Sequence, residues 1–148
     1  MMKPTLVIGL GNPLMGDDGV GWHVAERLAG DPRLPESVEV MCGGTDLLRC
    51  GGQMEGRSRV ILIDAIQDDR PAGSVLVLGE SFSEMDSRQE HAHHLSAVQA
   101  IQLLKMTVAA PIALLGISIR SAVARTELSP AVDGRMPSIV DRVLQELI

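Results

Sequence analysis

Hydrophobic residues along the chain follow two kinds of pattern, and the first kind predicts strands. Uninterrupted apolar runs at residues 5–10, 59–65 and 111–119 predict strands buried on both faces, and the alternating run at 37–42 predicts another. The short run at residues 74–79 follows a Pro-Ala-Gly turn. Because the connection before it is short, this segment is expected to be an antiparallel edge strand.

The second pattern has helical spacing and fills the gaps between the strands. Residues 18–29, about 93–106 and 129–148 carry it. The apolar residues on the inner faces are Val20, Val24, Ala25, Leu28, Val98, Ile101, Leu104, Ile139, Val140, Val143, Leu144 and Leu147. The polar stretch at residues 80–94 is predicted to be a loop, and loops of this length are commonly functional or mobile.

This order of elements predicts the fold class. Strands that alternate with helices form a mainly parallel sheet with right-handed crossovers. We therefore predict one α/β domain over residues 1–148, a three-layer α/β/α sandwich around a five-stranded sheet that is parallel except for one antiparallel edge strand.

Composition narrows the classes of partner. The chain has 13 basic and 19 acidic residues, and Trp22 and Phe82 are its only aromatic residues, which disfavours nucleic-acid binding. No apolar run is long enough to span a membrane, and the first residues do not form a signal peptide. We expect a cytoplasmic protein in which Cys42 and Cys50 are reduced thiols.

The loop after the first predicted strand, "VIGLGNPLMGDDGVG" at residues 7–21, resembles a phosphate-binding loop only in part. Its glycines have the spacing G-x-G-x-x-x-x-G in place of G-x-G-x-x-G, and Pro13 removes an amide donor. Asp17 and Asp18 would repel a pyrophosphate. Capping of the following helix accounts for one aspartate, and the second needs another explanation.

That explanation comes from the other strands, whose carboxyl ends meet at one edge of the sheet. Asp18 follows the first strand, and Asp64 ends the third, where capping of a turn is an equally good interpretation. Three histidines, His91, His93 and His94, precede the next helix. Two carboxylates and an imidazole suit a first-row divalent metal with open coordination positions.

Five motifs in order along the chain resemble those of the hydrogenase maturation proteases, which trim the C-terminus of nickel–iron hydrogenase large subunits. They are "GLGNPLMGDDGVG" at residues 9–21, "CGGT" at 42–45, "ILIDAI" at 61–66, "HHLS" at 93–96 and "ELSPAV" at 127–132. The resemblance implies a three-layer α/β fold and an endopeptidase whose partner is the large-subunit precursor, with the protease expected to be a monomer.

The resemblance also implies a site. Asp18, Asp64 and His93 take the roles of the residues that contact nickel already installed in the precursor, with His94 or His91 as alternatives to His93. The metal thus belongs to the substrate, and no permanently bound cofactor is expected. Residues expected to contact the substrate are Asn12, Asp17, Gly43, Gly44, Thr45 and Asp46. A tight turn explains the two glycines equally well.

Three other functions compete with this interpretation. "GLGNP" also opens the peptidyl-tRNA hydrolases, for which His23 is the one candidate catalytic histidine here, but the chain lacks a basic tRNA-binding cluster. A nucleotide-binding module is disfavoured by the loop chemistry. A metal-delivery or scaffold protein with the same ligands is not separated from a protease by sequence.

Overall fold

The computed structural model describes residues 2–78 and 92–148, without the side chains of residues 92–98. The strands in this part of the chain are β1 (Thr5–Leu10), β2 (Val38–Gly44), β3 (Arg59–Gln67), β4 (Val75–Leu78) and β5 (Ile112–Ile119). The α-helices are α1 (Val20–Ala29), α2 (Gly51–Met54), α3 (Ala92–Lys105), α4 (Pro130–Asp133) and α5 (Met136–Leu147). Two 3₁₀ turns, η1 (Gly16–Gly19) and η2 (Leu47–Cys50), precede α1 and α2.

The strands form one sheet in the order β2-β1-β3-β5-β4. β1, β2, β3 and β5 are parallel, and β4 pairs antiparallel with β5 at the edge. The predicted fold class, including the antiparallel edge strand, is confirmed. The short connection from β3 to β4 does not make these strands neighbours, since β5 is inserted between them.

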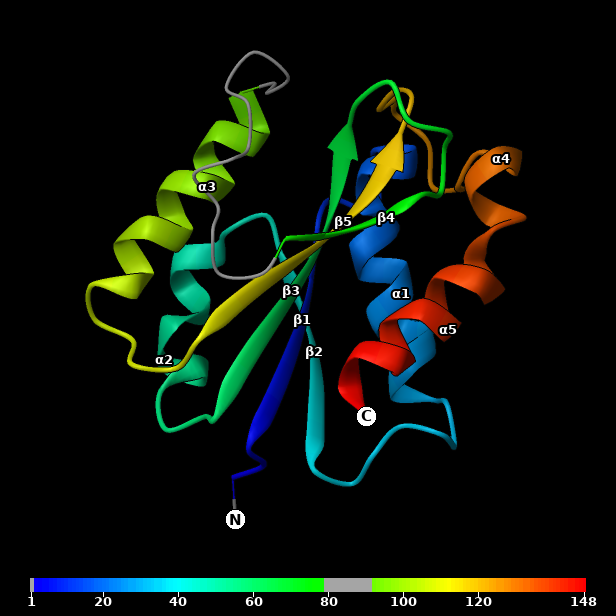
Figure 1. Ribbon diagram of the computed structural model, residues 1–148. Coiled ribbons are helices and arrows are strands. Elements are labelled where there is room, and N and C mark those ends of the chain that lie inside the picture. Colours follow the sequence, from blue (N-terminus) through cyan, green and yellow to red (C-terminus); the bar gives the residue numbers. More distant parts are fainter. Residues whose placement is uncertain (1, 79–91) are drawn as a thin grey trace.

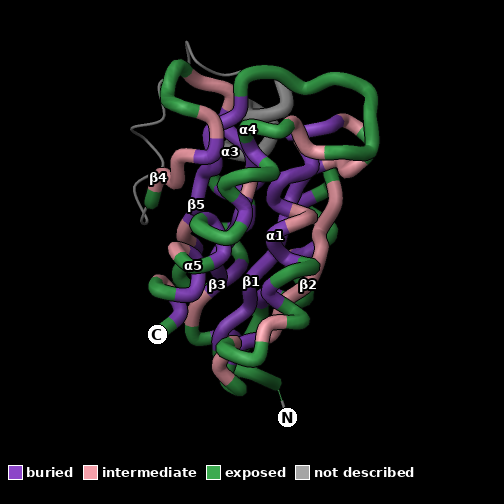
Figure 2. The backbone as a smooth tube through the Cα atoms, turned by 90° about the vertical axis from the view of Figure 1, so that its right-hand side faces the viewer, coloured by how far each residue is buried: buried purple, intermediate pink, exposed green. Residues whose placement is uncertain are grey.

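Helices cover both faces of the sheet (Figure 1), with α1, α4 and α5 on one face and α2 and α3 on the other. Buried residues run along the central strands and the inner sides of the helices (Figure 2). Alternate residues of β1 and β3 enter opposite cores: Val7 and Ile61 pack toward α1 and α5, whereas Ile8 and Leu62 pack toward α2 and α3. Burial on both faces explains why these strands are continuous apolar runs.

Several element boundaries differ from the sequence prediction. The helix predicted from residue 18 begins at Val20, because residues 16–19 form the tighter η1 turn. The last predicted helix is divided into α4 and α5. The predicted inner residues of the helices are buried wherever the structure describes their side chains; that of Val98 lies outside the description. Of the loop predicted at residues 80–94, residues 92–94 belong to α3, and the remainder lies outside the described residues.

The glycines of the opening loop bring α1 close to the sheet. A Cβ atom on Gly9 would overlap Gly21 and Ala25 of α1, and a Cβ atom on Gly21 would overlap backbone oxygens of Leu10 and Ile63. Gly11 has a φ of 116°, a value that favours glycine. These residues therefore serve close packing and a sharp turn, which explains a glycine pattern that resembles a nucleotide loop.

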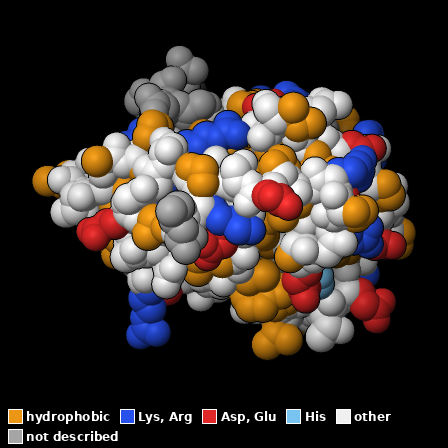
Figure 3. All heavy atoms as spheres, turned by 90° about the horizontal axis from the view of Figure 1, so that it is seen from below, with side chains coloured by type: hydrophobic (Ala, Val, Ile, Leu, Met, Phe, Trp, Pro, Cys, Tyr) orange, Lys and Arg blue, Asp and Glu red, His pale blue; other side chains and the backbone are white. Residues whose placement is uncertain are grey.

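Surface charge agrees with the composition. Lys and Arg side chains are interspersed with Asp and Glu on the face seen in Figure 3, with no continuous basic field there. None of the helices in the described residues is long and apolar enough to cross a membrane.

Candidate functional site

The candidate site lies at the carboxyl edge of the sheet, where the loop between β1 and α1 meets β3. The last β1–β3 pair is Gly9 with Ile63, so Asp64 is the first β3 residue after β1 turns away. β3 itself continues to Gln67 beside β5. The prediction that Asp64 ends its strand is therefore wrong: Asp64 lies within β3, at the place where the neighbouring strand has ended.

Asp64 lies on the α2–α3 side of the sheet, two residues after Leu62. Its side chain is half-buried, and Oδ1 accepts a hydrogen bond of 2.8 Å from the amide of Ala65. Burial raises the pKa of Asp64 to about 7; the Ala65 hydrogen bond lowers it, and the negative charge of Asp18 raises it further. The pKa of Asp64 therefore lies near neutral pH, and a second carboxylate, that of Asp18, contributes to this shift.

Asp18 is partly exposed in η1, at the start of the turn into α1. Its Oδ2 accepts a hydrogen bond of 3.1 Å from the amide of Asn12. The N-cap residue of α1 is Gly19, and no side chain caps this helix, so Asp18 does not have the capping role. The structure thus brings together two of the three predicted nickel-contacting residues, Asp18 and Asp64.

Asp17 behaves differently from its neighbour. Its side chain is only 5% exposed, and its two oxygens accept hydrogen bonds from the amide and the hydroxyl of Ser129, at 2.7 Å and 2.6 Å. Asp17 does not cap α1 either. Its expected contact with substrate is untested, but in the free protein this carboxylate has an internal partner.

His93 lies in the first turn of α3, and α3 begins at the edge of the sheet where the parallel strands end (Figure 1). The backbone thus places His93 and its neighbour His94 on the same side of the sheet as Asp64. Their side chains, and His91 altogether, lie outside the described residues. Among the side chains that are described, no group of three metal-ligating residues lies together. The predicted set of three therefore stays a prediction.

The segment "GGT" borders the same edge. Gly44 ends β2 with a φ of 66°, and its carbonyl accepts a hydrogen bond of 2.8 Å from the amide of Gly11 in the opening loop. Gly43 has no room for a side chain, because a Cβ atom there would lie 2.6 Å from Ile8 Cγ2. Both glycines belong to β2 and the turn begins at Thr45, so the interpretation of the two glycines as a turn after the strand is wrong. Their expected contact with substrate remains a prediction.

Two of the other three residues expected to contact substrate, Asn12 and Asp46, have partners within the chain. Thr45 is exposed, and the exposed Asp46 forms an ion pair of 3.0 Å with Arg49. The side-chain oxygen of Asn12 accepts a hydrogen bond of 2.9 Å from the amide of Leu14. None of these contacts prevents an exposed group from meeting a protein substrate.

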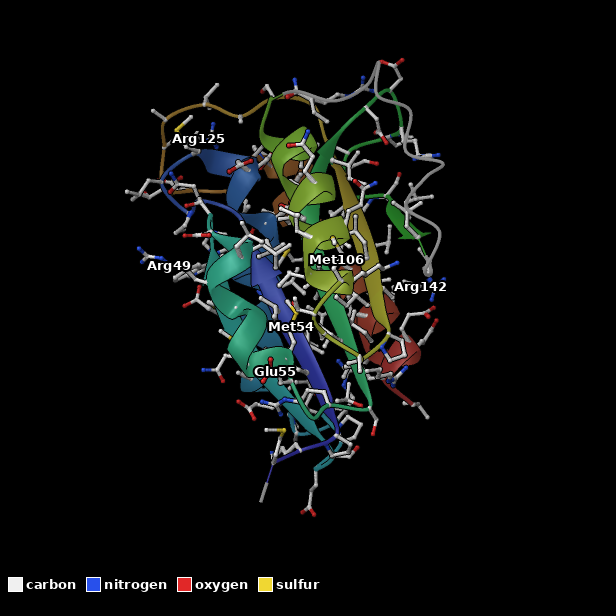
Figure 4. All side chains as sticks on the ribbon, turned by 90° about the vertical axis from the view of Figure 1, so that its left-hand side faces the viewer. Arg49, Met54, Glu55, Met106, Arg125 and Arg142 are labelled. Carbon is white, nitrogen blue, oxygen red and sulfur yellow. The ribbon has the colours of Figure 1, made fainter. Side chains whose placement is uncertain are left out.

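Sequence reasoning missed a segment from the far end of the chain that supports the opening loop. Arg125 donates its amide to the carbonyl of Leu14 at 3.1 Å and accepts from the amide of Gly16 at 2.7 Å. Figure 4 shows Arg125 in the loop at the carboxyl edge, away from Met54 and Met106. The motif containing Ser129 was visible in the sequence, but nothing in it indicated Asp17 as the partner.

Neither cysteine of the chain is a good candidate nucleophile. Cys42 and Cys50 are free, as expected from the sequence. Burial raises the pKa of both thiols, with a smaller contribution from Glu26 at Cys42 and from Asp46 at Cys50. Because the thiolate is the reactive form, a raised pKa disfavours attack by either residue.

His23, the histidine that a peptidyl-tRNA hydrolase would need, lies on α1, on the face of the sheet opposite to Asp64. It borders a groove of about 480 Å³ with Glu26, Thr126, Glu127 and Asp133 among its walls. Its Nδ1 lies 3.6 Å from Glu26 Oε1, and its buried Nε2 has no hydrogen-bond partner within the described part of the chain. His23 therefore does not join the acidic site.

Together, these features define a class of protein: a three-layer α/β domain with two neighbouring carboxylates at the carboxyl edge of its sheet. The glycines of its first loop are used for packing, and no nucleotide is needed to explain them. A cation placed between two such carboxylates would be stabilised by both.

Comparisons with known proteins identify the family. A sequence model described as hydrogenase maturation protease (HycI) matches residues 22–146. The hydrogenase 2 maturation protease of Escherichia coli (strain K12) is 29% identical over 146 residues, covering 96% of this chain and 89% of that protein. The chain therefore belongs to the hydrogenase maturation protease family, and it is a peptidase.

Solved structures agree with this assignment. The structure of the E. coli hydrogenase maturating endopeptidase HybD has a TM-score of 0.83 at 27% identity, with coverage of 97% of this chain and 91% of that chain. The [NiFe] hydrogenase maturation protease HybD of Thermococcus kodakarensis has a TM-score of 0.81, also at 27% identity, with coverage of 97% and 99%. The resemblance suggested by the sequence motifs is thus confirmed at the level of family and fold.

Proposed function

We propose that this protease removes the C-terminal extension of a nickel-loaded [NiFe]-hydrogenase large-subunit precursor, and that Asp18, Asp64 and His93 contact the nickel carried by that precursor. The observation that carries the proposal is the pair of carboxylates at the carboxyl edge: the charge of Asp18 acts on Asp64, and burial has already raised the pKa of Asp64 to about 7. α3, with His93 in its first turn, begins at this edge.

Electrostatics explains why a metal-loaded substrate is preferred. In the free protein, ionised Asp64 is disfavoured by burial and by Asp18. A divalent cation between the two carboxylates replaces this repulsion with attraction, and an imidazole is a suitable further ligand for nickel. A precursor without nickel leaves the repulsion in place, so the site distinguishes loaded from unloaded precursor.

The metal also supplies the chemistry that peptide cleavage requires. A divalent ion polarises a carbonyl oxygen or lowers the pKa of a bound water, and either effect favours hydrolysis of the neighbouring peptide bond. The residues of this chain hold the metal-loaded end of the precursor against the sheet edge. We place the reaction in the cytoplasm, a reducing compartment compatible with the free thiols of Cys42 and Cys50.

The proposal is tested with purified precursor, loaded with nickel or prepared without it. Wild-type protein should cleave the loaded precursor and leave the other intact. Asp18→Ala, Asp64→Ala and His93→Ala should each abolish cleavage and keep the circular dichroism spectrum of the wild type. Glu36→Ala, which removes an exposed carboxylate outside the site, is the matched control and should cleave normally. Normal cleavage by all three site variants would refute the assignment.

A second test locates the metal directly. Crystals of the purified protein are soaked in a millimolar nickel or cadmium salt, and the anomalous difference map is calculated. A single strong peak shared by Asp18, Asp64 and a histidine of residues 91–94 is the expected result. A map in which the side chains of Asp18 and Asp64 diverge and share no peak would contradict the proposed site.

A further inference from the structure

The contact between Asp17 and Ser129 joins two segments separated by 112 positions in the sequence. A buried carboxylate is stable only when its oxygens are hydrogen-bonded, and here both oxygens have short, charge-assisted partners. Ser129 is also the N-cap of α4: its hydroxyl oxygen accepts from the amide of Val132 at 3.4 Å. The hydroxyl of Ser129 thus connects Asp17 to the start of a helix.

The same two segments are joined by backbone contacts. Arg125 exchanges hydrogen bonds with both sides of Met15, donating to the carbonyl of Leu14 and accepting from the amide of Gly16. The Arg125 guanidinium donates to the carbonyls of Glu127 and Leu128 at 3.1 Å and 3.2 Å, which maintains the shape of this segment on its way to Ser129. The contact between Asp17 and Ser129 therefore belongs to a set of hydrogen bonds that joins the opening loop to residues 125–129.

This support matters for Asp18 because η1, the turn that carries both Asp17 and Asp18, is short. η1 has four residues and no side-chain cap, and 3₁₀ turns have poorer hydrogen-bond geometry than α-helices. Asp18 is held on its other side by the Asn12 amide, which donates to Oδ2. Because residues 17 and 18 share a peptide unit, a shift of residue 17 would also move the backbone that carries the Asp18 carboxylate.

We infer that Asp17, through its two hydrogen bonds to Ser129, is a positioning residue that holds the Asp18 carboxylate in the site. The inference rests on the proposed function where it concerns cleavage. It assigns different roles to two adjacent aspartates: Asp18 meets the substrate, and Asp17 fixes the turn that presents it. Misplacement by about 1 Å is enough to cost an enzyme roughly a hundredfold in rate.

The test uses variants of graded severity. Asp17→Asn keeps the shape of the side chain but removes its charge, and its single oxygen can accept from only one of the two Ser129 donors while the NH₂ group faces the other. Ser129→Ala removes the hydroxyl contact with Asp17 together with the hydroxyl cap of α4 at Val132, and Ser129→Thr keeps a hydroxyl for both and should rescue. Ile139→Val, in the buried face of α5, is the control for a general loss of stability. Single-turnover cleavage of nickel-loaded precursor and the ¹⁵N–¹H spectrum of each protein are measured well below the melting temperature.

We expect cleavage to fall by about a hundredfold in Asp17→Asn and about tenfold in Ser129→Ala, and to stay within twofold of wild type in Ser129→Thr and Ile139→Val. The amide resonance of Asn12, which reports on Asp18, should move in the first two variants and not in the last two. Unchanged Asn12 resonances, or unchanged cleavage, in both Asp17→Asn and Ser129→Ala would overturn the inference.

The two readouts separate this inference from the proposed function. If wild-type protein does not cleave the nickel-loaded precursor, the proposed function fails, and the Asn12 resonance still decides whether Asp17 positions Asp18. If wild-type protein cleaves and Asp17→Asn cleaves equally well with an unmoved Asn12 resonance, the proposed function stands and the positioning role is excluded. Should Asp17→Asn fail to fold, Ser129→Ala alone decides.

Discussion

Ionisable side chains with little exposure lie at both ends of the parallel strands, the amino edge and the carboxyl edge of the sheet, and their surroundings differ. At the amino edge, Arg57 is 7% exposed, and its guanidinium donates to Gln53 O at 2.9 Å, Lys3 O at 2.8 Å and Glu39 Oε1 at 3.0 Å. At the carboxyl edge, the half-buried Asp64 has a single hydrogen bond within the described residues, from Ala65, and a like charge nearby.

Under the proposed function, this is the difference between a structural charge and a functional one. A buried charge with several hydrogen bonds and an opposite charge contributes to the fold, whereas a charge beside a like charge disfavours its own ionised form. Ionisable groups whose pKa values are strongly shifted in this way are concentrated at binding and catalytic sites. Arg57 connects segments of the chain, whereas under the proposed function Asp64 meets the cation that the precursor carries.

The largest expected effect is on catalysis at the carboxyl edge. Asp64→Asn keeps the acceptor for the Ala65 amide but removes the charge, and cleavage of nickel-loaded precursor should fall about a thousandfold, which corresponds to roughly 4 kcal/mol. Single-turnover kinetics measures the loss. Cleavage within threefold of wild type would mean that the charge of Asp64 is not used, and the comparison of the two edges would fail.

The next effect, at the amino edge, is on stability alone. Arg57→Met leaves two backbone carbonyls and Glu39 without their donor, so the free energy of unfolding should fall by about 2–3 kcal/mol. Urea denaturation measures this change. Cleavage per folded molecule at low temperature should equal that of wild type, because Arg57 lies at the opposite edge from the site.

A smaller effect is the pH dependence of stability. The pKa of Asp64 rises from 3.8 to about 7 on folding, so its protonated form favours the folded state. This contribution is complete below about pH 4 and is lost as the pH rises through 7. The unfolding free energy of wild type minus that of Asp64→Asn should therefore decrease over this range, by on the order of 1–2 kcal/mol once solvent screening is allowed for.

Urea titrations of both proteins at several pH values test this. A difference that is constant from pH 4 to pH 8 would show that Asp64 titrates as an ordinary exposed aspartate.

The smallest effect concerns the interaction between the two carboxylates. Asp18→Asn removes one negative charge, so the pKa of Asp64 should fall while it stays above its usual value, because burial is the largest cause of the shift. Carbon-detected NMR titration of the Asp64 carboxyl measures it, and Glu36→Gln is the control. An unchanged pKa in Asp18→Asn would mean that the two carboxylates do not interact.

Much of the fold was predictable because it depends on local pattern. β1 and β5 are continuous apolar runs, and the inner residues of α1 and α5 recur at helical spacing, so both their type and their burial follow from the order of residues. Boundaries were less predictable. β3 continues three residues past Asp64 because β5 lies alongside it, and pairing with a strand distant in sequence leaves no local signal.

The candidate site was predictable only in part. Asp18 and Asp64 were identified because they follow apolar runs whose carboxyl ends meet at one edge. The different contacts of Asp17 and Asp18 could not be predicted, because by sequence both residues are equally good helix caps. In the structure neither of them caps α1. The place of His93 at the start of α3 agrees with the motif, and its side chain lies outside the described residues.

The sequence by itself determined the α/β class, the order of the elements and the residues available for chemistry, because hydrophobic periodicity and residue type are local properties of a chain. Only the tertiary structure decided which of these residues interact. It placed Ser129 against Asp17, inserted β5 between β3 and β4, and brought Asp18 near Asp64. Burial and Coulomb interactions depend on distances in space, and for segments far apart in the chain those distances exist only once the sheet has formed.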